Sequence, residues 1–148
     1  MSKRVRLIVA AVLFVGWLGW LSIAAITKSR APTVSRAQAA VATVPVVAKL
    51  KTGENGKPET TATVVERIKE DGPAVGTEIV VTNLSEATGF SGPGPYLLLL
   101  TSVKSDGQSN YLLVGQQRSP GTDLTDVGPP KIYPWSEDVR KQVVRLFP

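Results

Sequence analysis

The run Tyr96-Leu97-Leu98-Leu99-Leu100 directly follows the segment Gly92-Pro93-Gly94-Pro95. The glycines and prolines exclude a helix before this run, because proline lacks an N–H donor and both residues interrupt regular helices. A continuous apolar run of this length is typical of a strand buried on both faces, with a buried helix as the competing interpretation. We therefore expect residues 96–100 to form the central strand of a sheet.

The segments on either side of this run alternate between apolar and polar residues, which is the pattern of strands with one face on a core. We expect these strands over residues 44–51, 60–69, 77–84 and 111–114. The apolar positions that share one face are Val44, Val46, Ala48 and Leu50 in the first, Ala62, Val64 and Ile68 in the second, and Ile79 and Val81 in the third.

Turn signals separate these strands. Gly53-Glu54-Asn55-Gly56 contains an Asn-Gly pair, which tolerates the positive φ of a tight hairpin, and Ser105-Asp106-Gly107 follows the central run. Together the strands and turns predict a mainly β domain over residues 44–148. An early hairpin, a third strand and a central meander favour a small OB-like barrel or sandwich of five or six strands.

The last part of the chain is a long connection followed by a helix. Residues 116–135 are rich in proline and glycine, so either a short strand lies at residues 131–133 or the loop has a function. The helix is expected over residues 136–147, with Ser136 as its N-cap. Its apolar stripe lies on the sheet or plugs one end of a barrel. The stripe consists of Val139, Val143, Leu146 and Phe147.

Residues 7–26, LIVAAVLFVGWLGWLSIAAI, form a second long apolar run, and it carries no charge. At about 1.5 Å per residue, a helix of this length matches a hydrocarbon core of about 30 Å, so a transmembrane helix in contact with lipid is predicted. The competing interpretation is a signal peptide cleaved after residues 1–24. The run is longer than the usual apolar region of a signal peptide, about 7 to 15 residues, which favours the anchor. Both interpretations send the rest of the chain out of the cytoplasm.

The basic residues around the span predict its orientation. Three lie within residues 1–6, and two follow the span at Lys28 and Arg30. Because cationic flanks are retained on the cytoplasmic side, we expect a cytoplasmic head at residues 1–6 and an extracytoplasmic domain anchored in the cell (inner) membrane. Residues 27–43 are small, polar and alanine-rich without an apolar face, so we interpret them as a tether.

Charge and composition exclude several classes of function. The net charge is +5, but five of the 17 Lys and Arg residues precede Ala31, which leaves 12 basic against 12 acidic residues beyond that point. The domain therefore has no electrostatic signature of nucleic-acid binding. There is no Cys and no His, which excludes thiolate zinc sites, thiol-attached haem, Cys nucleophiles and Ser-His-Asp triads. We predict no cofactor and no metal, and the sequence indicates no oligomeric state.

Three aromatic residues in glycine- and proline-rich loops are the candidates for partner binding: Phe90, Tyr133 and Trp135. Aromatic side chains on rigid loops bind partners with little loss of entropy, but they also cap the ends of small β domains, which is the competing interpretation. The only acid or base candidates are the carboxylates near the second turn, and their spacing alone places no pair in a pocket. These carboxylates are Glu66, Glu70, Asp71 and Glu78.

Part of the chain, about residues 44–114, resembles the OB-type modules related to netrin and metalloproteinase-inhibitor domains. The resemblance is carried by the segments Val64-Val65-Glu66-Arg67-Ile68-Lys69, Gly76-Thr77-Glu78-Ile79-Val80-Val81 and Tyr96-Leu97-Leu98-Leu99-Leu100. It implies an OB-like barrel. The cysteines of those modules are missing, so no inhibitory function is implied. An anchor followed by an OB barrel also resembles the membrane-anchored haem chaperones, but their haem-binding His has no counterpart here.

These observations predict a membrane-anchored, extracytoplasmic binding or assembly module of the cell envelope, without catalytic activity and with other membrane or envelope proteins as partners. Confinement to a membrane raises effective concentration, so weak contacts suffice. Two alternatives remain open. One is a carboxylate-dependent envelope hydrolase, and the other is a secreted soluble β domain if the apolar run is a cleaved signal peptide.

Overall fold

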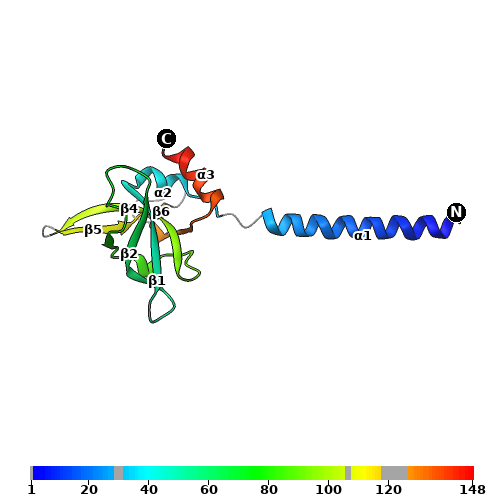
Figure 1. Ribbon diagram of the computed structural model, residues 1–148, viewed down its shortest axis with the longest axis horizontal. Coiled ribbons are helices and arrows are strands. Elements are labelled where there is room, and N and C mark those ends of the chain that lie inside the picture. Colours follow the sequence, from blue (N-terminus) through cyan, green and yellow to red (C-terminus); the bar gives the residue numbers. More distant parts are fainter. Residues whose placement is uncertain (1, 29–31, 106–107, 118–126) are drawn as a thin grey trace. The chain divides into compact units, whose positions relative to one another are not determined.

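The computed structural model describes residues 2–28, 32–105, 108–117 and 127–148. The chain divides into two units, Met1–Ala31 and Pro32–Pro148 (Figure 1). The first unit holds one helix, α1 (Lys3–Lys28), which contains the expected apolar run. This helix is long and apolar enough to cross a membrane, a property that an N-terminal signal sequence shares.

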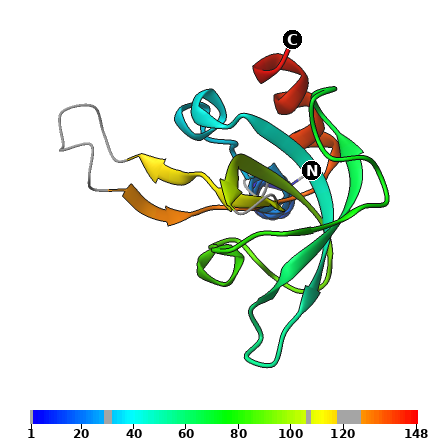
Figure 2. The same ribbon diagram turned by 90° about the vertical axis from the view of Figure 1, so that its left-hand side faces the viewer.

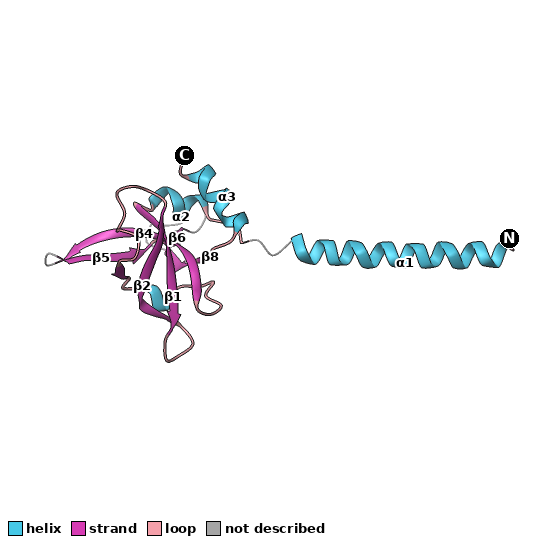
Figure 3. Cartoon of the chain, viewed as in Figure 1, coloured by secondary structure: helices cyan, strands magenta, loops and turns pink. Residues whose placement is uncertain are grey.

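The second unit is mainly sheet, with a helix near each of its ends (Figure 3). Its elements are α2 (Arg36–Val41), β1 (Val44–Thr52), β2 (Pro58–Arg67), β3 (Glu78–Val80), the 3-10 helix η1 (Leu84–Glu86), β4 (Gly94–Ser105), β5 (Gln108–Leu113), β6 (Gly115–Gln117), β7 (Val127–Pro130), β8 (Tyr133–Pro134) and α3 (Glu137–Leu146). The mainly β domain with a C-terminal helix is therefore confirmed.

Five strands of the main sheet follow the order β3-β2-β1-β4-β5, and β8 adds to β4. The sheet is not closed into a barrel. Among the described residues, the outer strands β3 and β5 form no ladder with each other, and one parallel bridge joins Val81, directly after β3, to Tyr111 of β5. The OB-like barrel is thus not confirmed. Strands β6 and β7 form a separate hairpin that projects from the domain (Figure 2).

Strand β4 lies inside the sheet, as predicted. It pairs with β1 on one side and with β5 and β8 on the other, and residues 96–100 are at most 3% exposed. Its side chains alternate between two apolar clusters. Tyr96, Leu98 and Leu100 enter the first cluster with Ile79 and Leu84, whereas Leu97 and Leu99 enter the second, which α2 and α3 cover.

The folded unit begins at Pro32, which corrects the expected tether over residues 27–43. Residues 29–31 lie outside the described residues, but α2 belongs to the domain. It is fixed by the fully buried amide of Gln38, whose Nε2 donates to the carbonyls of Val114 at 2.6 Å and Lys131 at 3.0 Å. The prediction was wrong because it required an apolar face, whereas this helix is held by a polar side chain and small neighbours. The apolar residues that join the second cluster here are Val34, Ala39 and Ala42.

A change of register in β2 corrects the predicted face of Ile68. Val47 pairs with Glu66, but Ala48 pairs with Val64, so Val65 is an extra residue in the β2 strand. Such a bulge reverses the alternation of side chains beyond it. Ile68 therefore packs against the second cluster, under α3, instead of joining Val64 in the first.

The predicted helix over residues 136–147 is confirmed as α3, whose N-cap Ser136 accepts a hydrogen bond from the Val139 N–H at 3.3 Å. Its stripe packs on the face of the sheet that carries Leu97 and Leu99, so the helix covers a sheet face. The connection over residues 116–135 contains the last two residues of β6 and all of β7 and β8. Residues 118–126 of this connection and residues 106–107 of the predicted turn lie outside the described residues.

The third predicted strand, residues 77–84, is shorter than expected. β3 ends at Val80, and the chain turns into η1 at Leu84. The side chain of Asn83 makes the contact that a longer strand would make: its Nδ2 donates to the carbonyl of Leu113 at 3.1 Å, and its Oδ1 accepts from the Leu113 N–H at 2.8 Å. Asn83 thereby ties the end of β3 to β5.

Candidate functional site

Tyr133, one of the three predicted aromatics, is inside the domain. Its side chain is fully buried in the second cluster. Its hydroxyl donates to Oε1 of Gln38 at 2.9 Å and accepts from the N–H of Ser35 at 3.0 Å. Burial raises the pKa of the Tyr133 hydroxyl, and the hydrogen bond from the Ser35 backbone opposes this shift. Tyr133 therefore holds α2 on the sheet and does not present a binding surface.

Phe90 packs against the first cluster, on the other face of the sheet from Tyr133. Its ring centroid lies 5.5 Å from that of Tyr96, whose hydroxyl donates to the carbonyl of Gly92 at 2.8 Å. These contacts hold the glycine- and proline-rich loop against the core. The structure thus does not bring Phe90, Tyr133 and Trp135 together, and Phe90 and Tyr133 take the core-capping role that was the competing interpretation.

Trp135 is the predicted aromatic that lies in a hollow. It follows β8 and directly precedes the N-cap of α3. Its backbone N–H donates to the carbonyl of Pro95 at 3.0 Å. The indole is partly buried against the second cluster and borders a groove of about 250 Å³. We call this hollow the Trp135 groove. It is lined by Glu66, Arg67, Ile68, Trp135, Arg140, Val143, Val144, Phe147 and Pro148.

The Trp135 groove lies between the end of β2 and helix α3. The bulge at Val65 brings Glu66 and Ile68 to the side of the sheet that α3 covers, and the helix supplies Val143 and Phe147 opposite them. The groove therefore exists because of an irregularity in β2. A strictly alternating strand would have placed Ile68 in the first cluster.

The chemistry of the Trp135 groove is mixed. Trp135, Ile68 and Phe147 give it an apolar floor, whereas Arg67 and Arg140 provide two guanidinium groups against the single carboxylate side chain of Glu66. Beside it, the Lys69 ammonium lies 5.2 Å from the ring centroid of Phe147, a cation–π distance. Such a site fits a ligand that combines an apolar group with a carboxylate, because arginine binds carboxylates through two parallel N–H donors.

The predicted carboxylates do not form a pair in the three hollows that the described residues line. Glu70, Asp71 and Glu78 are exposed, and Glu66 is partly buried. The Trp135 groove, a hollow of about 290 Å³ between β3 and β5, and one of about 310 Å³ on the outer side of α3 each contain one carboxylate side chain. In the part of the chain that the structure describes, no three acidic residues gather where they would hold a metal ion.

No protein-family model, curated protein or solved structure matches this chain. The residues of the Trp135 groove are therefore the basis for a functional hypothesis. Of these, the sequence identified Trp135 directly, and the helical stripe identified Val143 and Phe147 as apolar. Arg67 and Arg140 were missed as site residues, and Glu66 was considered only as an acid or base candidate, because the bulge that brings β2 to α3 has no signal in a pattern of period two.

Proposed function

We propose that this protein is a membrane-anchored, non-catalytic binding module that holds another protein of the cell envelope in the Trp135 groove. The observation that carries this proposal is the combination of a partly buried indole with two arginines from different elements, β2 and α3, around one apolar floor. Tryptophan and arginine are among the residues most enriched where binding energy concentrates at protein interfaces. The preferred partner segment carries a carboxylate next to an apolar side chain.

The proposal includes an anchor with a cytoplasmic N-terminus. α1 is long and apolar enough to span a bilayer, and three basic residues precede it. In this arrangement the domain is outside the cytoplasm, and its partners are held at the same membrane. A protein confined to a surface meets other membrane proteins at high effective concentration, so a groove of modest size is sufficient.

The OB-like architecture belongs to the same proposal. The strand order β3-β2-β1-β4-β5, the parallel bridge between Val81 and Tyr111, and a short helix between β3 and β4 support it. The N–H of Thr82 donates to the carbonyl of Tyr111 at 3.0 Å, across the gap that a closed barrel would seal. Slow hydrogen exchange at the Thr82 amide is expected if this closure persists in solution, and exchange at the rate of an exposed amide would contradict it.

Photocrosslinking in intact cells tests the binding function. A benzoylphenylalanine at position 66 stands at the edge of the Trp135 groove, and the same residue at Glu59 is the matched control, since both positions are glutamates on β2. We expect position 66 to give discrete adducts with membrane or envelope proteins and position 59 to give none of them. The adducts should disappear in the Trp135→Ala and Arg67→Glu variants.

The same experiment can contradict the proposal. Identical adducts from positions 66 and 59, or adducts from position 66 that survive both Trp135→Ala and Arg67→Glu, would show that the groove does not select a partner. Circular dichroism of each variant controls for loss of the fold. Arg67→Glu should leave the fold intact, because Arg67 is exposed and its replacement leaves the core unchanged.

A further inference from the structure

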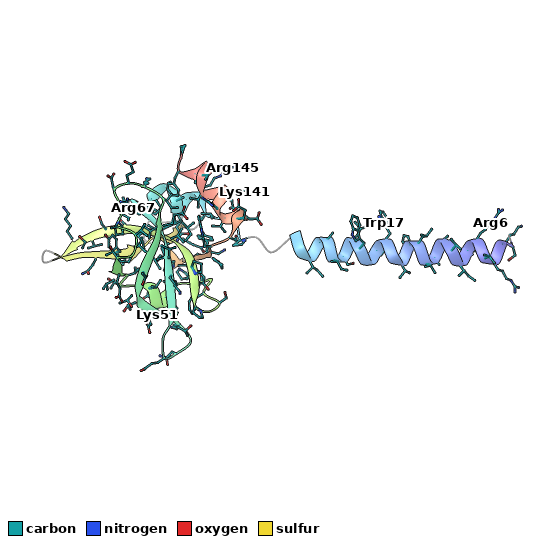
Figure 4. The ribbon with its side chains drawn as sticks, in the orientation of Figure 1. Arg6, Trp17, Lys51, Arg67, Lys141 and Arg145 are labelled. Atoms are coloured by element: carbon teal, nitrogen blue, oxygen red, sulfur yellow. The ribbon has the colours of Figure 1, made fainter. Side chains whose placement is uncertain are left out.

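The outer side of α3 carries a group of basic side chains around an exposed apolar one. Arg140, Lys141 and Arg145 are exposed, and between them Val144 is 66% exposed. They border a shallow hollow of about 310 Å³ that contains one carboxylate, Glu137. We call Arg140, Lys141, Val144 and Arg145 the basic face of α3. Figure 4 shows Lys141 and Arg145 on this helix, at the opposite end of the domain from Lys51.

The first residues of the folded unit are bound directly to α3. The side chain of Gln142 donates from Nε2 to the carbonyl of Pro32 at 3.1 Å, and its Oε1 accepts from the N–H of Val34 at 2.9 Å. These two bonds fix the first described residues of the domain to the helix that carries the basic face. The domain therefore begins against α3, the helix that carries the basic face.

The chain between α1 and this point is short. α1 ends at Lys28 and the folded unit begins at Pro32, so only residues 29–31 separate them. Four peptide steps reach at most about 14 Å even when fully extended. The number of residues sets this limit, whatever conformation they adopt. The long tether expected from the sequence would have allowed the domain to move away from the membrane, but this connection does not.

We infer that the basic face of α3 binds an anionic lipid surface next to the anchor. This inference rests on the proposed membrane anchor. Lys and Arg near an anionic leaflet gain electrostatic energy, and their long side chains reach the headgroups while Val144 contacts the interface. In the sequence, two further basic residues, Lys28 and Arg30, precede Pro32 by four and two positions. Because Arg140 and Val144 also border the Trp135 groove, the groove then opens beside the membrane.

Single-cysteine labelling of the full chain tests this contact, since the protein has no cysteine of its own. The full chain is reconstituted into vesicles of phosphatidylcholine, with or without phosphatidylglycerol, and a fluorescent label is attached at Val144→Cys or at Glu54→Cys. Glu54 lies in the turn between β1 and β2, and Figures 1 and 2 show this turn away from α3. Nitroxide groups on the lipid headgroups quench a label that touches the surface.

We expect strong quenching at position 144 in vesicles with phosphatidylglycerol, weaker quenching without it, and little at position 54 in either. The double substitution Lys141→Gln and Arg145→Gln should lower the ratio of surface-bound to unbound domain about fivefold for each charge removed. The matched substitution Lys49→Gln and Lys51→Gln, which removes two exposed charges from β1, should leave this ratio unchanged. High ionic strength should reduce the quenching, because salt screens exposed charges.

Two quenching results would overturn the inference. Flotation of the vesicles after an alkaline carbonate wash shows separately whether the chain is anchored in the bilayer. If the chain floats with the lipid but the label at position 144 is quenched no more than the label at 54, the lipid contact is wrong and the anchor stands. Equal quenching at 144 with and without phosphatidylglycerol also overturns it. If the chain does not float, the anchor and the contact are both wrong.

Discussion

The hydroxyl of Tyr133 donates a hydrogen bond to Oε1 of Gln38 across 2.9 Å, between residues 95 positions apart in the chain. Both side chains are fully buried, and the Gln38 amide also donates to the carbonyls of Val114 and Lys131. All of these polar atoms have partners, which is the condition under which buried polar groups stabilise a core. This network joins α2, the first helix of the folded unit, to the strands of the sheet.

Replacing Tyr133 with phenylalanine should destabilise the domain. The change removes one hydroxyl, and it leaves the buried Oε1 of Gln38 and the partly buried N–H of Ser35 without this partner. Losing a buried partner costs about 1–3 kcal/mol. Denaturant unfolding of the full chain in detergent, followed by tryptophan fluorescence, measures the change. Tyr111→Phe, at a partly buried position, is the control and should change the free energy of unfolding by less than about 0.5 kcal/mol.

The stability of the domain should fall at high pH because of the same hydroxyl. Burial raises the pKa of Tyr133 above its usual value of about 10, so the folded state binds this proton more tightly than the unfolded state. The resulting stabilisation is complete below the unfolded pKa, and it is lost as the pH rises above about 10 towards the folded pKa. Unfolding measured from about pH 8 to pH 11 should show a steeper loss for the wild type than for Tyr133→Phe. Parallel curves for the two proteins would refute this assignment.

Gly89 should tolerate no side chain, unlike Gly76. Both have positive φ, +93° and +85°. A Cβ at Gly89 would collide with the carbonyl oxygen of Ile132, whereas a Cβ at Gly76 would meet no atom within 4 Å. Gly76→Ala should therefore cost only the left-handed backbone penalty of about 1–2 kcal/mol, and Gly89→Ala should cost about 3–5 kcal/mol. Thermal unfolding compares them, and equal losses would mean that the two backbone segments do not approach this closely.

Asn83→Ala should loosen β5 locally. The Asn83 amide makes two hydrogen bonds to the backbone of Leu113, at 3.1 and 2.8 Å. Without them, hydrogen exchange at the Leu113 amide should accelerate about tenfold. The neighbouring Val114 amide, which donates to the carbonyl of Leu99 at 2.9 Å, serves as an internal control. An unchanged rate at Leu113 would show that this amide contributes nothing to the edge of the sheet.

Local patterns predicted the parts of the fold that depend on neighbours in sequence. The run at residues 96–100 gave the central strand because burial on both faces requires five consecutive apolar side chains, and the cap at Ser136 with the stripe of Val139 and Val143 gave α3. Each of these signals lies within one element. The sequence also indicated Trp135 as a surface aromatic, although it placed Phe90 and Tyr133 in the same class.

The features that the sequence did not reveal depend on residues far apart. Helix α2 has no apolar stripe, and it is held by Gln38 through partners 76 and 93 positions away. The bulge at Val65 depends on pairing with β1, so a regular alternation placed Ile68 on the wrong face. Tyr133 and Trp135 are two positions apart, yet one is in the core and the other borders a groove. Periodicity contains no information about such pairings.

Protease protection on vesicles of known sidedness, read by mass spectrometry, tests most directly the claim that this is an anchored extracytoplasmic module. We expect the full-length chain to stay in the membrane, with sites beyond Pro32 cut only from the extracytoplasmic side until detergent opens the vesicles. A soluble form that begins near Ala25, or cleavage beyond Pro32 only from the cytoplasmic side, would contradict the account.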